Sequence, residues 1–174
     1  HTVCEATFLS RGTFESAVAT CLTLSPRGDC PDSPYGPIQE WDVSVVSDMD
    51  NIFADATSFN GDISKWDVSN VLTMNGMFAR THLFNSDLSG WDVSRVVNMH
   101  EMFMDAKAFE QELCGASWVD STAGKDDMFS GSPGSISTTA CTASTQIFSP
   151  QSQEELKNAV DKCQELSARG GCSE

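Results

Sequence analysis

Residues 66–78 read WDVSNVLTMNGMF, and closely similar stretches begin 25 residues earlier, at Trp41, and 25 residues later, at Trp91. A fixed period of roughly 20–50 residues is typical of proteins built from stacked repeats. In such a stack each repeat buries its apolar face against its neighbours, so the recurring residues are expected to form the core. The predicted repeat core consists of Trp41, Trp66, Trp91, Met74, Met99, Phe53, Phe78, Phe103, Phe59, Phe84 and Phe109.

Each repeat is predicted to run strand, corner, helix, corner. Residues 62–69 are rich in β-forming and hydrogen-bonding residues, which is typical of a short strand followed by a turn. Residues 71–84 carry apolar side chains at steps of three and four, which favours one face of a helix. Ser44, Ser69 and Ser94 stand before these stretches and are predicted helix caps. The predicted fold class is therefore an α/β repeat solenoid of stacked strand–helix coils, with a disulfide-tied helical cap at each end.

The seven cysteines lie outside the three regular repeats and flank them. None has the spacing of a CxxC pair or a zinc site, so the sequence predicts no metal centre built on cysteine. Their placement is typical of disulfides that staple the two ends, which implies an oxidising compartment such as the extracellular space or an organelle lumen. The predicted bonds are Cys21–Cys30, Cys114–Cys141 and Cys163–Cys172, which leaves Cys4 unpaired.

A second, longer repeat relates the two ends of the chain. The pattern of residues 17–30 recurs 142 residues later, in residues 159–172, with its two cysteines at the same spacing. Both copies predict an amphipathic helix tied to the loop that follows it, and Ser152 with Glu155 forms a capping box in the second copy. Two interpretations stay open. The chain is one period of a tandem array, in which Cys4 pairs with a neighbouring module, or the capping helix was duplicated within the gene and Cys4 is free.

The predicted organisation has four parts. They are a helical cap with a disulfide loop at 1–37, three regular repeats at 38–109, a degenerate capping repeat with a Ser/Gly/Thr-rich segment at 110–148, and a C-terminal helix at 149–174 that repeats the N-terminal cap and could begin a further module.

Composition excludes several classes of function. The chain has 10 basic and 25 acidic residues among 174, a formal net charge of −15. This charge disfavours binding to nucleic acid or to anionic membranes, because both are polyanions. No apolar run approaches the roughly 18 residues of a membrane-spanning helix, so membrane insertion is not expected. We expect a processed product or a fragment, because the chain starts with His1 and shows no signal-peptide pattern.

The run from Trp66 to Phe78 continues as FNSDLSGW over residues 84–91. Together these residues resemble the BspA-type leucine-rich-repeat surface-protein family, whose unit reads W-D-V-S-x-V-x-x-M-x-x-M-F-x-x-A-x-x-F-N-x-D-L-S and is also catalogued as a domain of unknown function. The match spans about residues 38–128, and residues 14–30 resemble segments that precede such repeats in microalgal and other protist proteins. The resemblance implies a right-handed stack with a parallel sheet on one side, a secreted or surface location, and adhesion or protein binding. It implies no catalytic residues.

Two rows of acidic residues are the candidate metal ligands. Stacking would bring Asp42, Asp67 and Asp92 about 5 Å apart, the spacing of adjacent strands. Asp62 and Asp87 would lie in a second row. Because like charges at this distance repel, something must compensate. Either each carboxylate accepts backbone amides at its own corner, as in Asx turns, or calcium bridges the row.

No arrangement of residues predicts an enzyme. The methionines lie mostly on the apolar register and are predicted to be core, while His82 and His100 occupy variable surface positions. The sequence contains no acid/base pair, phosphate loop or cofactor motif. No cofactor is therefore expected, calcium apart.

Three non-catalytic functions fit the sequence. The first is a secreted or cell-surface module that binds other proteins in adhesion. The second is a structural subunit of an extracellular filament or assembly, built from copies of itself in tandem modules of about 142 residues. The third is an acidic accessory subunit in an oxidising organelle lumen.

Overall fold

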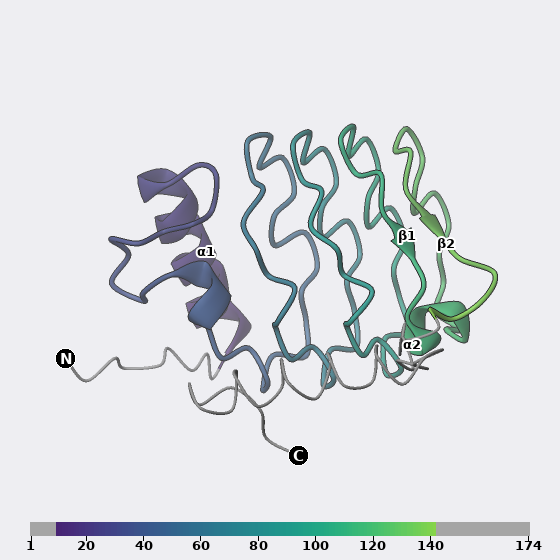
Figure 1. Ribbon diagram of the computed structural model, residues 1–174. Helices are drawn as coiled ribbons and strands as arrows, with labels where there is room; N and C mark the ends of the chain where they lie inside the picture. Colours follow the sequence, from purple (N-terminus) through teal and green to yellow (C-terminus); the bar gives the residue numbers. More distant parts are fainter. Residues whose placement is uncertain (1–9, 142–174) are drawn as a thin grey trace, which may run out of the picture. The chain divides into compact units, whose positions relative to one another are not determined.

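The structure, a computed structural model, describes residues 10–141. Helix α1 (Arg11–Leu24) stands at one end of a stack of chain turns, and strand β2 (Ser135–Ile136) lies at the other end (Figure 1). The remaining elements are a 3₁₀-helix (Ile38–Glu40), strand β1 (Glu112–Leu113) and helix α2 (Ala116–Val119). We name residues 41–65, 66–90, 91–115 and 116–141 coils 1 to 4. The predictions for Cys4, for the Cys163–Cys172 bond and for the helix in 149–174 lie outside the described residues.

The predicted α/β solenoid of strand–helix coils is wrong. Residues 41–111 contain no helix and no strand, and consist of turns with isolated bridges. Those bridges join equivalent residues of successive coils in parallel, Asp48 to Thr73 to Asn98 to Gly124. The one sheet in the described part of the chain pairs Glu112 with Ser135 and Leu113 with Ile136, also in parallel. Since the repeats contain no helix, the predicted capping role of Ser44, Ser69 and Ser94 is wrong as well.

The repeats are not helical because every second amide of the turns bonds to the next coil, while the amides between them bond to the carbonyl three residues back. The N–H of Gly76 donates to the carbonyl of His100 and that of Phe78 to the carbonyl of Met102, both at 2.8 Å, whereas a helix would use the carbonyl four residues back. Left-handed φ angles of 59° at Gly76 and 60° at Arg80 also interrupt any helix. Successive tight turns bring side chains inward at steps of three and four, so the apolar spacing alone does not distinguish them from a helix.

Two columns of phenylalanine rings run through the middle of the stack. Phe78 stacks on its equivalents in the coils before and after it, with ring centroids 5.6 and 5.4 Å apart, and on Phe84 of its own coil at 4.2 Å. The two columns therefore form one continuous aromatic core, in which every ring is buried except the partly buried Phe129. The columns consist of Phe53, Phe78, Phe103 and Phe129 on one side and Phe59, Phe84 and Phe109 on the other.

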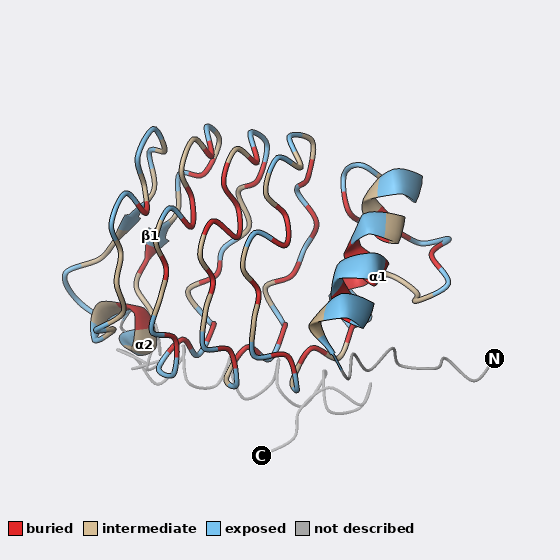
Figure 2. Cartoon of the chain, turned by 180° about the vertical axis from the view of Figure 1, so that it is seen from behind, coloured by how far each residue is buried: buried red, intermediate tan, exposed pale blue. Residues whose placement is uncertain are grey.

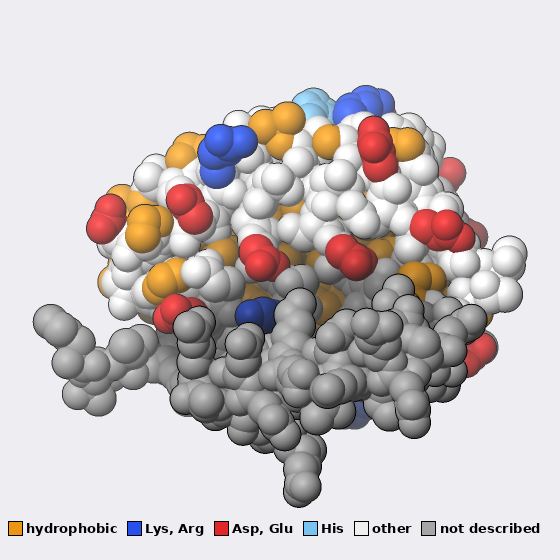
Figure 3. Space-filling view, viewed as in Figure 1, with side chains coloured by type: hydrophobic (Ala, Val, Ile, Leu, Met, Phe, Trp, Pro, Cys, Tyr) orange, Lys and Arg blue, Asp and Glu red, His pale blue; other side chains and the backbone are white. Residues whose placement is uncertain are grey.

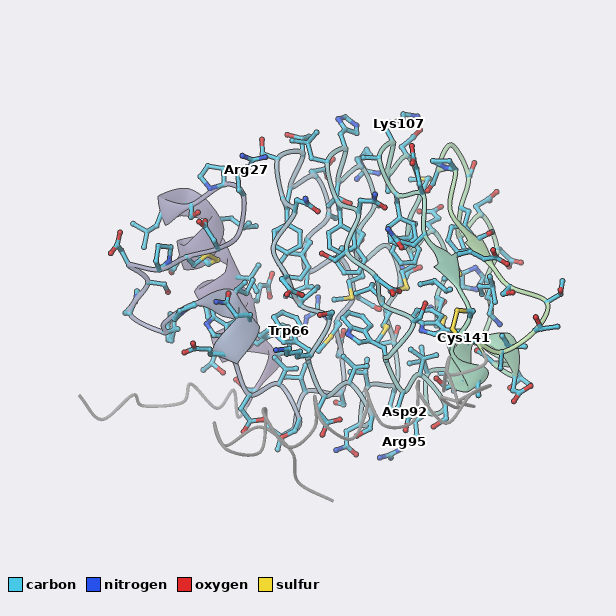
Figure 4. The ribbon with its side chains drawn as sticks, viewed as in Figure 1. Arg27, Trp66, Asp92, Arg95, Lys107 and Cys141 are labelled. Carbon is cyan, nitrogen blue, oxygen red and sulfur yellow. A yellow bond between two sulfur atoms is a disulfide. The ribbon has the colours of Figure 1, made fainter. Side chains whose placement is uncertain are left out.

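The tryptophans fasten each coil to the structure before it. The indole N–H of Trp66 donates to the carbonyl of Ile38 at 2.9 Å, and the indole of Trp91 repeats this bond one coil later. In coil 4 the bond is made by Trp118, which lies on α2 and reaches Leu88 at 2.8 Å. Every predicted core residue is at least 96% buried. Figure 4 shows Trp66 inside the stack.

Helix α1 covers the first coil with its apolar face. Phe14, Ala17, Val18 and Cys21 are buried on the side that meets the stack, and the opposite side of the helix is exposed (Figure 2). Its first residue, Arg11, binds the carboxylate of Asp48 and donates to the carbonyl of Asp50 at 2.8 Å. The Cys21–Cys30 disulfide then ties the helix to its loop. At Gly28 that loop lies directly against Phe59 of coil 1. The φ angle of Gly28 is +91°, and a Cβ there would lie 2.3 Å from the Phe59 ring.

Coil 4 departs from the regular repeat. The helix α2 replaces its first corner, and the disulfide between Cys114 and Cys141, with Cα atoms 4.8 Å apart, closes it (Figure 4). Residues 124–131 nevertheless keep the turns of the earlier coils and stack on coil 3 through the bridge of Gly124.

Substitution of Trp66 tests how the coils are held together. Trp66→Ala is expected to lower the free energy of unfolding by about 3–5 kcal/mol, because the change removes a buried ring and leaves a cavity in its place. Trp66→Phe keeps an aromatic ring but removes one of the two hydrogen bonds to the Ile38 carbonyl, which also accepts from the N–H of Trp41 at 3.3 Å, so a loss of roughly 0.5–1.5 kcal/mol is expected. Urea denaturation measures both.

The matched control is Val97→Ala, because Val97 is 69% exposed. It should change stability by less than about 0.5 kcal/mol. A loss below about 1 kcal/mol for Trp66→Ala would contradict the core assignment.

Candidate functional site

The aspartates of the first acidic row serve as acceptors inside their own turns. Asp67 accepts from the backbone N–H of Ser69 at 3.1 Å and from its hydroxyl at 2.6 Å. Asp42 and Asp92 accept the same backbone bond from the serine two residues later, at 3.0 Å. These are Asx turns, so the structure favours the first of the two interpretations of this row.

The second row uses the same turn. Asp62 accepts from the N–H and the hydroxyl of Ser64, and Asp87 accepts from the N–H of Ser89. Hydrogen bonds from the following serine hold the pKa of Asp62 below its usual value, and the pKa of Asp92 in the first row likewise. Within residues 10–141 no three or more His, Cys, Asp or Glu side chains are placed to hold a metal ion.

A third row of charge lies along the edge of the stack marked by Lys107, opposite the edge marked by Asp92 and Arg95 (Figure 4). The guanidinium of Arg80 binds Asp55 of the previous coil with two hydrogen bonds, at 2.5 and 2.8 Å. Arg80 lowers the pKa of Asp55, and an ion pair with Lys107 lowers that of Asp105. These side chains are well exposed, so such pairs add little stability.

A hollow of about 430 Å³ lies where the loop after α1 meets coil 1. Its two carboxylates, Asp29 and Asp62, both have a lowered pKa because neighbouring serines donate to them. Neither therefore offers the protonated acid that general acid catalysis requires near neutral pH. The lining consists of Arg27, Asp29, Gln39, Asn60, Gly61 and Asp62.

The two surface histidines lie apart from this hollow. His100 lies where coil 3 contacts coil 4, and its Nδ1 atom is 3.2 Å from the exposed carboxylate of Asp126. His82 follows the Arg80 row, and its charge acts on Asp55 and Asp105.

The feature that sequence reasoning did not locate is an exposed face on the first corner of the coils. We call it the turn face and define it as Val45, Ser47, Asn70, Leu72, Arg95 and Val97, all of them exposed. Val45 is 54% exposed, Leu72 42% and Val97 69%, unusually high for aliphatic side chains. In each of coils 1 to 3, two exposed residues of the turn face flank one buried valine. These valines are Val46, Val71 and Val96. The alternation of a constant and a variable position was the signal in the sequence.

Neighbouring coils are linked across the turn face. The side-chain amide of Asn70 donates to the carbonyl of Ser44 at 2.8 Å, and Arg95 donates to the side-chain oxygen of Asn70 at 2.5 Å. The backbone N–H of Val97 donates to the carbonyl of Leu72 at 2.8 Å. The turn face is therefore a rigid surface of mixed apolar and polar character. Acidic side chains are scattered over the side of the molecule seen in Figure 3, with few basic ones.

The methionines on the apolar register lie in the core, whereas Met104, which is off that register, is only half-buried. Met49, Met74, Met77, Met99 and Met102 are fully buried, and none of them forms an exposed soft-metal site. No helix in the described residues is long and apolar enough to cross a membrane.

Comparisons with known proteins support a family assignment. Searches of the curated proteins and of the solved structures find no match to the chain. A family model described as "Mycoplasma protein of unknown function, DUF285" matches residues 29–140. This range includes coils 1 to 3 and all of coil 4 except its last residue. This match covers more than half of the 174 residues, and the chain belongs to the DUF285 family.

Proposed function

We propose that the chain is a non-catalytic, secreted or cell-surface module of the BspA type that binds other proteins through the turn face. The observation that carries this proposal is the pattern at 45–47, 70–72 and 95–97, where a buried valine is constant and its two exposed neighbours differ in every coil. A constant scaffold with variable exposed residues is how repeat proteins build binding surfaces.

The chemistry of the turn face suits a protein partner. The turn face combines the exposed aliphatic side chains of Val45, Leu72 and Val97 with Arg95. The buried centre of a protein–protein interface is more apolar than the rest of the surface, and arginine is enriched in interfaces. The net charge of −15 disfavours a nucleic-acid or anionic-lipid partner. The proposed binding needs no cofactor.

The proposed location rests on the cysteines. The bonds Cys21–Cys30 and Cys114–Cys141 require an oxidising environment to persist. An extracellular location and an oxidising organelle lumen both provide it, and the resemblance to BspA-type surface proteins favours the first.

A double variant of the turn face tests the proposal. Leu72→Asp with Val97→Asp should fold normally, because both side chains are well exposed, and should lose most of the binding. Beads that carry the wild-type chain or the variant are incubated with the secreted proteins of the source culture, and the retained proteins are quantified by mass spectrometry.

Leu83→Asp is the matched control, because Leu83 is 48% exposed and lies outside the turn face. The control should retain the same proteins as the wild type. Equal retention by the double variant and the wild type would refute a role for the turn face.

A second candidate is a structural subunit of a larger assembly, and the 142-residue recurrence of residues 17–30 favours it. In such an assembly Cys4 would be bonded to a cysteine of another module. Disulfide mapping of the native protein under non-reducing conditions tests this. Cys4 joined to a peptide of another module would support the assembly, and a free Cys4 thiol would contradict it.

A further inference from the structure

The hydrogen bonds between coils all point the same way in one part of the repeat. In coil 2 the N–H groups of residues 74, 76, 78 and 80 donate to carbonyls of coil 3 at 2.7–2.9 Å. In the same manner, the equivalent N–H groups of coil 1 donate to coil 2 and those of coil 3 donate to coil 4, at 2.7–3.0 Å. Every second residue of this segment is thus a donor toward the next coil, and the residues between supply the acceptors.

Coil 4 has the same donors, and no further coil follows it within residues 10–141. The equivalent residues are Lys125, Asp127, Phe129 and Gly131, and we call their four N–H groups the donor edge. None of these groups makes a hydrogen bond within residues 10–141. The ring of Phe129 ends its column, stacked on Phe103 at 5.4 Å and only partly buried, whereas the three earlier rings of that column are at most 1% exposed.

The donor edge cannot pair with itself. The carbonyls of Lys125, Asp127 and Phe129 already accept bonds inside their own turns, at 2.9–3.1 Å. A two-fold contact between two copies would therefore face N–H against N–H. The first coil of a second copy is also closed to it, because α1 covers that coil and Arg11 occupies the carbonyl of Asp50.

The edge also disfavours anions. The carboxylate of Asp126 has 85% of its side chain exposed, and Asp127 is exposed beside it. These charges repel a phosphate or carboxylate that would otherwise suit a row of N–H groups. Neutral carbonyl oxygens are the acceptors that remain.

We propose that the open end of coil 4, made of the donor edge and Phe129, is a docking surface for an uncapped repeat coil of another polypeptide. The partner segment supplies four carbonyls at alternate residues and an aromatic side chain that packs on Phe129. This contact repeats the interface that joins coils 1, 2 and 3 to their successors, so its geometry is already present three times in the chain. The surface is separate from the turn face and does not depend on the function proposed for it.

A peptide with the sequence of coil 2, residues 66–91, is the probe, because its carbonyls at 73, 75, 77 and 79 accept the equivalent bonds from coil 1. Amide hydrogen exchange of the full chain is followed by NMR with and without the peptide at about 1 mM, where a tenfold slowing corresponds to a dissociation constant of about 0.1 mM. Exchange at Lys125, Asp127, Phe129 and Gly131 should slow at least tenfold, while the amides of the turn face stay unchanged.

Two single changes test the aromatic contact. A peptide with Phe78→Ala should bind at least tenfold more weakly, and so should the Phe129→Glu chain with the unchanged peptide. Leu83→Glu is the matched control in the chain and should bind as the wild type does. The Phe78→Ala peptide is tested on the wild-type chain. This part of the test therefore holds even if Phe129→Glu disturbs coil 4.

The proposal fails if the four amides exchange at the same rate with and without the peptide. It also fails if the Phe78→Ala peptide protects them equally well. A symmetric dimer of the chain that is abolished by Phe129→Glu would contradict it too, because the donor edge has no acceptors for a second copy.

Discussion

The structure depends on the register between coils, in which each residue of one coil lies over its equivalent in the next. Every second backbone N–H group of the turns has no partner within its own coil, so it must find a carbonyl in the neighbouring coil. A shift of the register would break this ladder and misplace the phenylalanine rings that stack at 5.4–5.9 Å from coil to coil. The two requirements are met together only when the repeats have equal length, which explains the strict period of 25 residues.

The period and the buried residues could be predicted from the sequence, because identical residues at identical spacing must share one environment. The conformation of the repeats could not. The apolar steps at Met74, Met77 and Phe78 suit a helix and a run of tight turns equally well, and the difference lies in bonds to Met102 and His100, far along the chain. Gly76 was one local sign, but its equivalents Asn51 and Glu101 adopt the same left-handed φ without being glycine.

The candidate site, like the fold, could be predicted from the sequence only in part. The serine partners of Asp42, Asp67 and Asp92, two residues later in each case, were visible in the sequence, and the structure shows that each aspartate accepts the backbone N–H of its serine. The turn face could not be located, because it requires knowing that the residues on both sides of Val71 and Val96 point outward. Alternation of exposure around a buried valine is a strand-like feature inside what was predicted to be the start of a helix.

The two ends of the stack differ for a physical reason. Coil 1 presents carbonyls and an aromatic face, and α1 covers them with Phe14 and with a hydrogen bond from Arg11. Coil 4 presents N–H groups instead, and within residues 10–141 these groups make no hydrogen bond. The asymmetry gives the stack a direction, and only one of its ends is closed by a helix among the described residues.

The central claim is that every second amide in the turns of the repeats bonds to the next coil, as those of Gly76, Phe78 and Arg80 do. The direct measurement is NMR scalar coupling across hydrogen bonds, read at the amide of Phe78. The account predicts a coupling to the carbonyl carbon of Met102, whose oxygen lies 2.8 Å from that nitrogen. A coupling to the carbonyl carbon of Met74, four residues back, is what a helix would give and would contradict it.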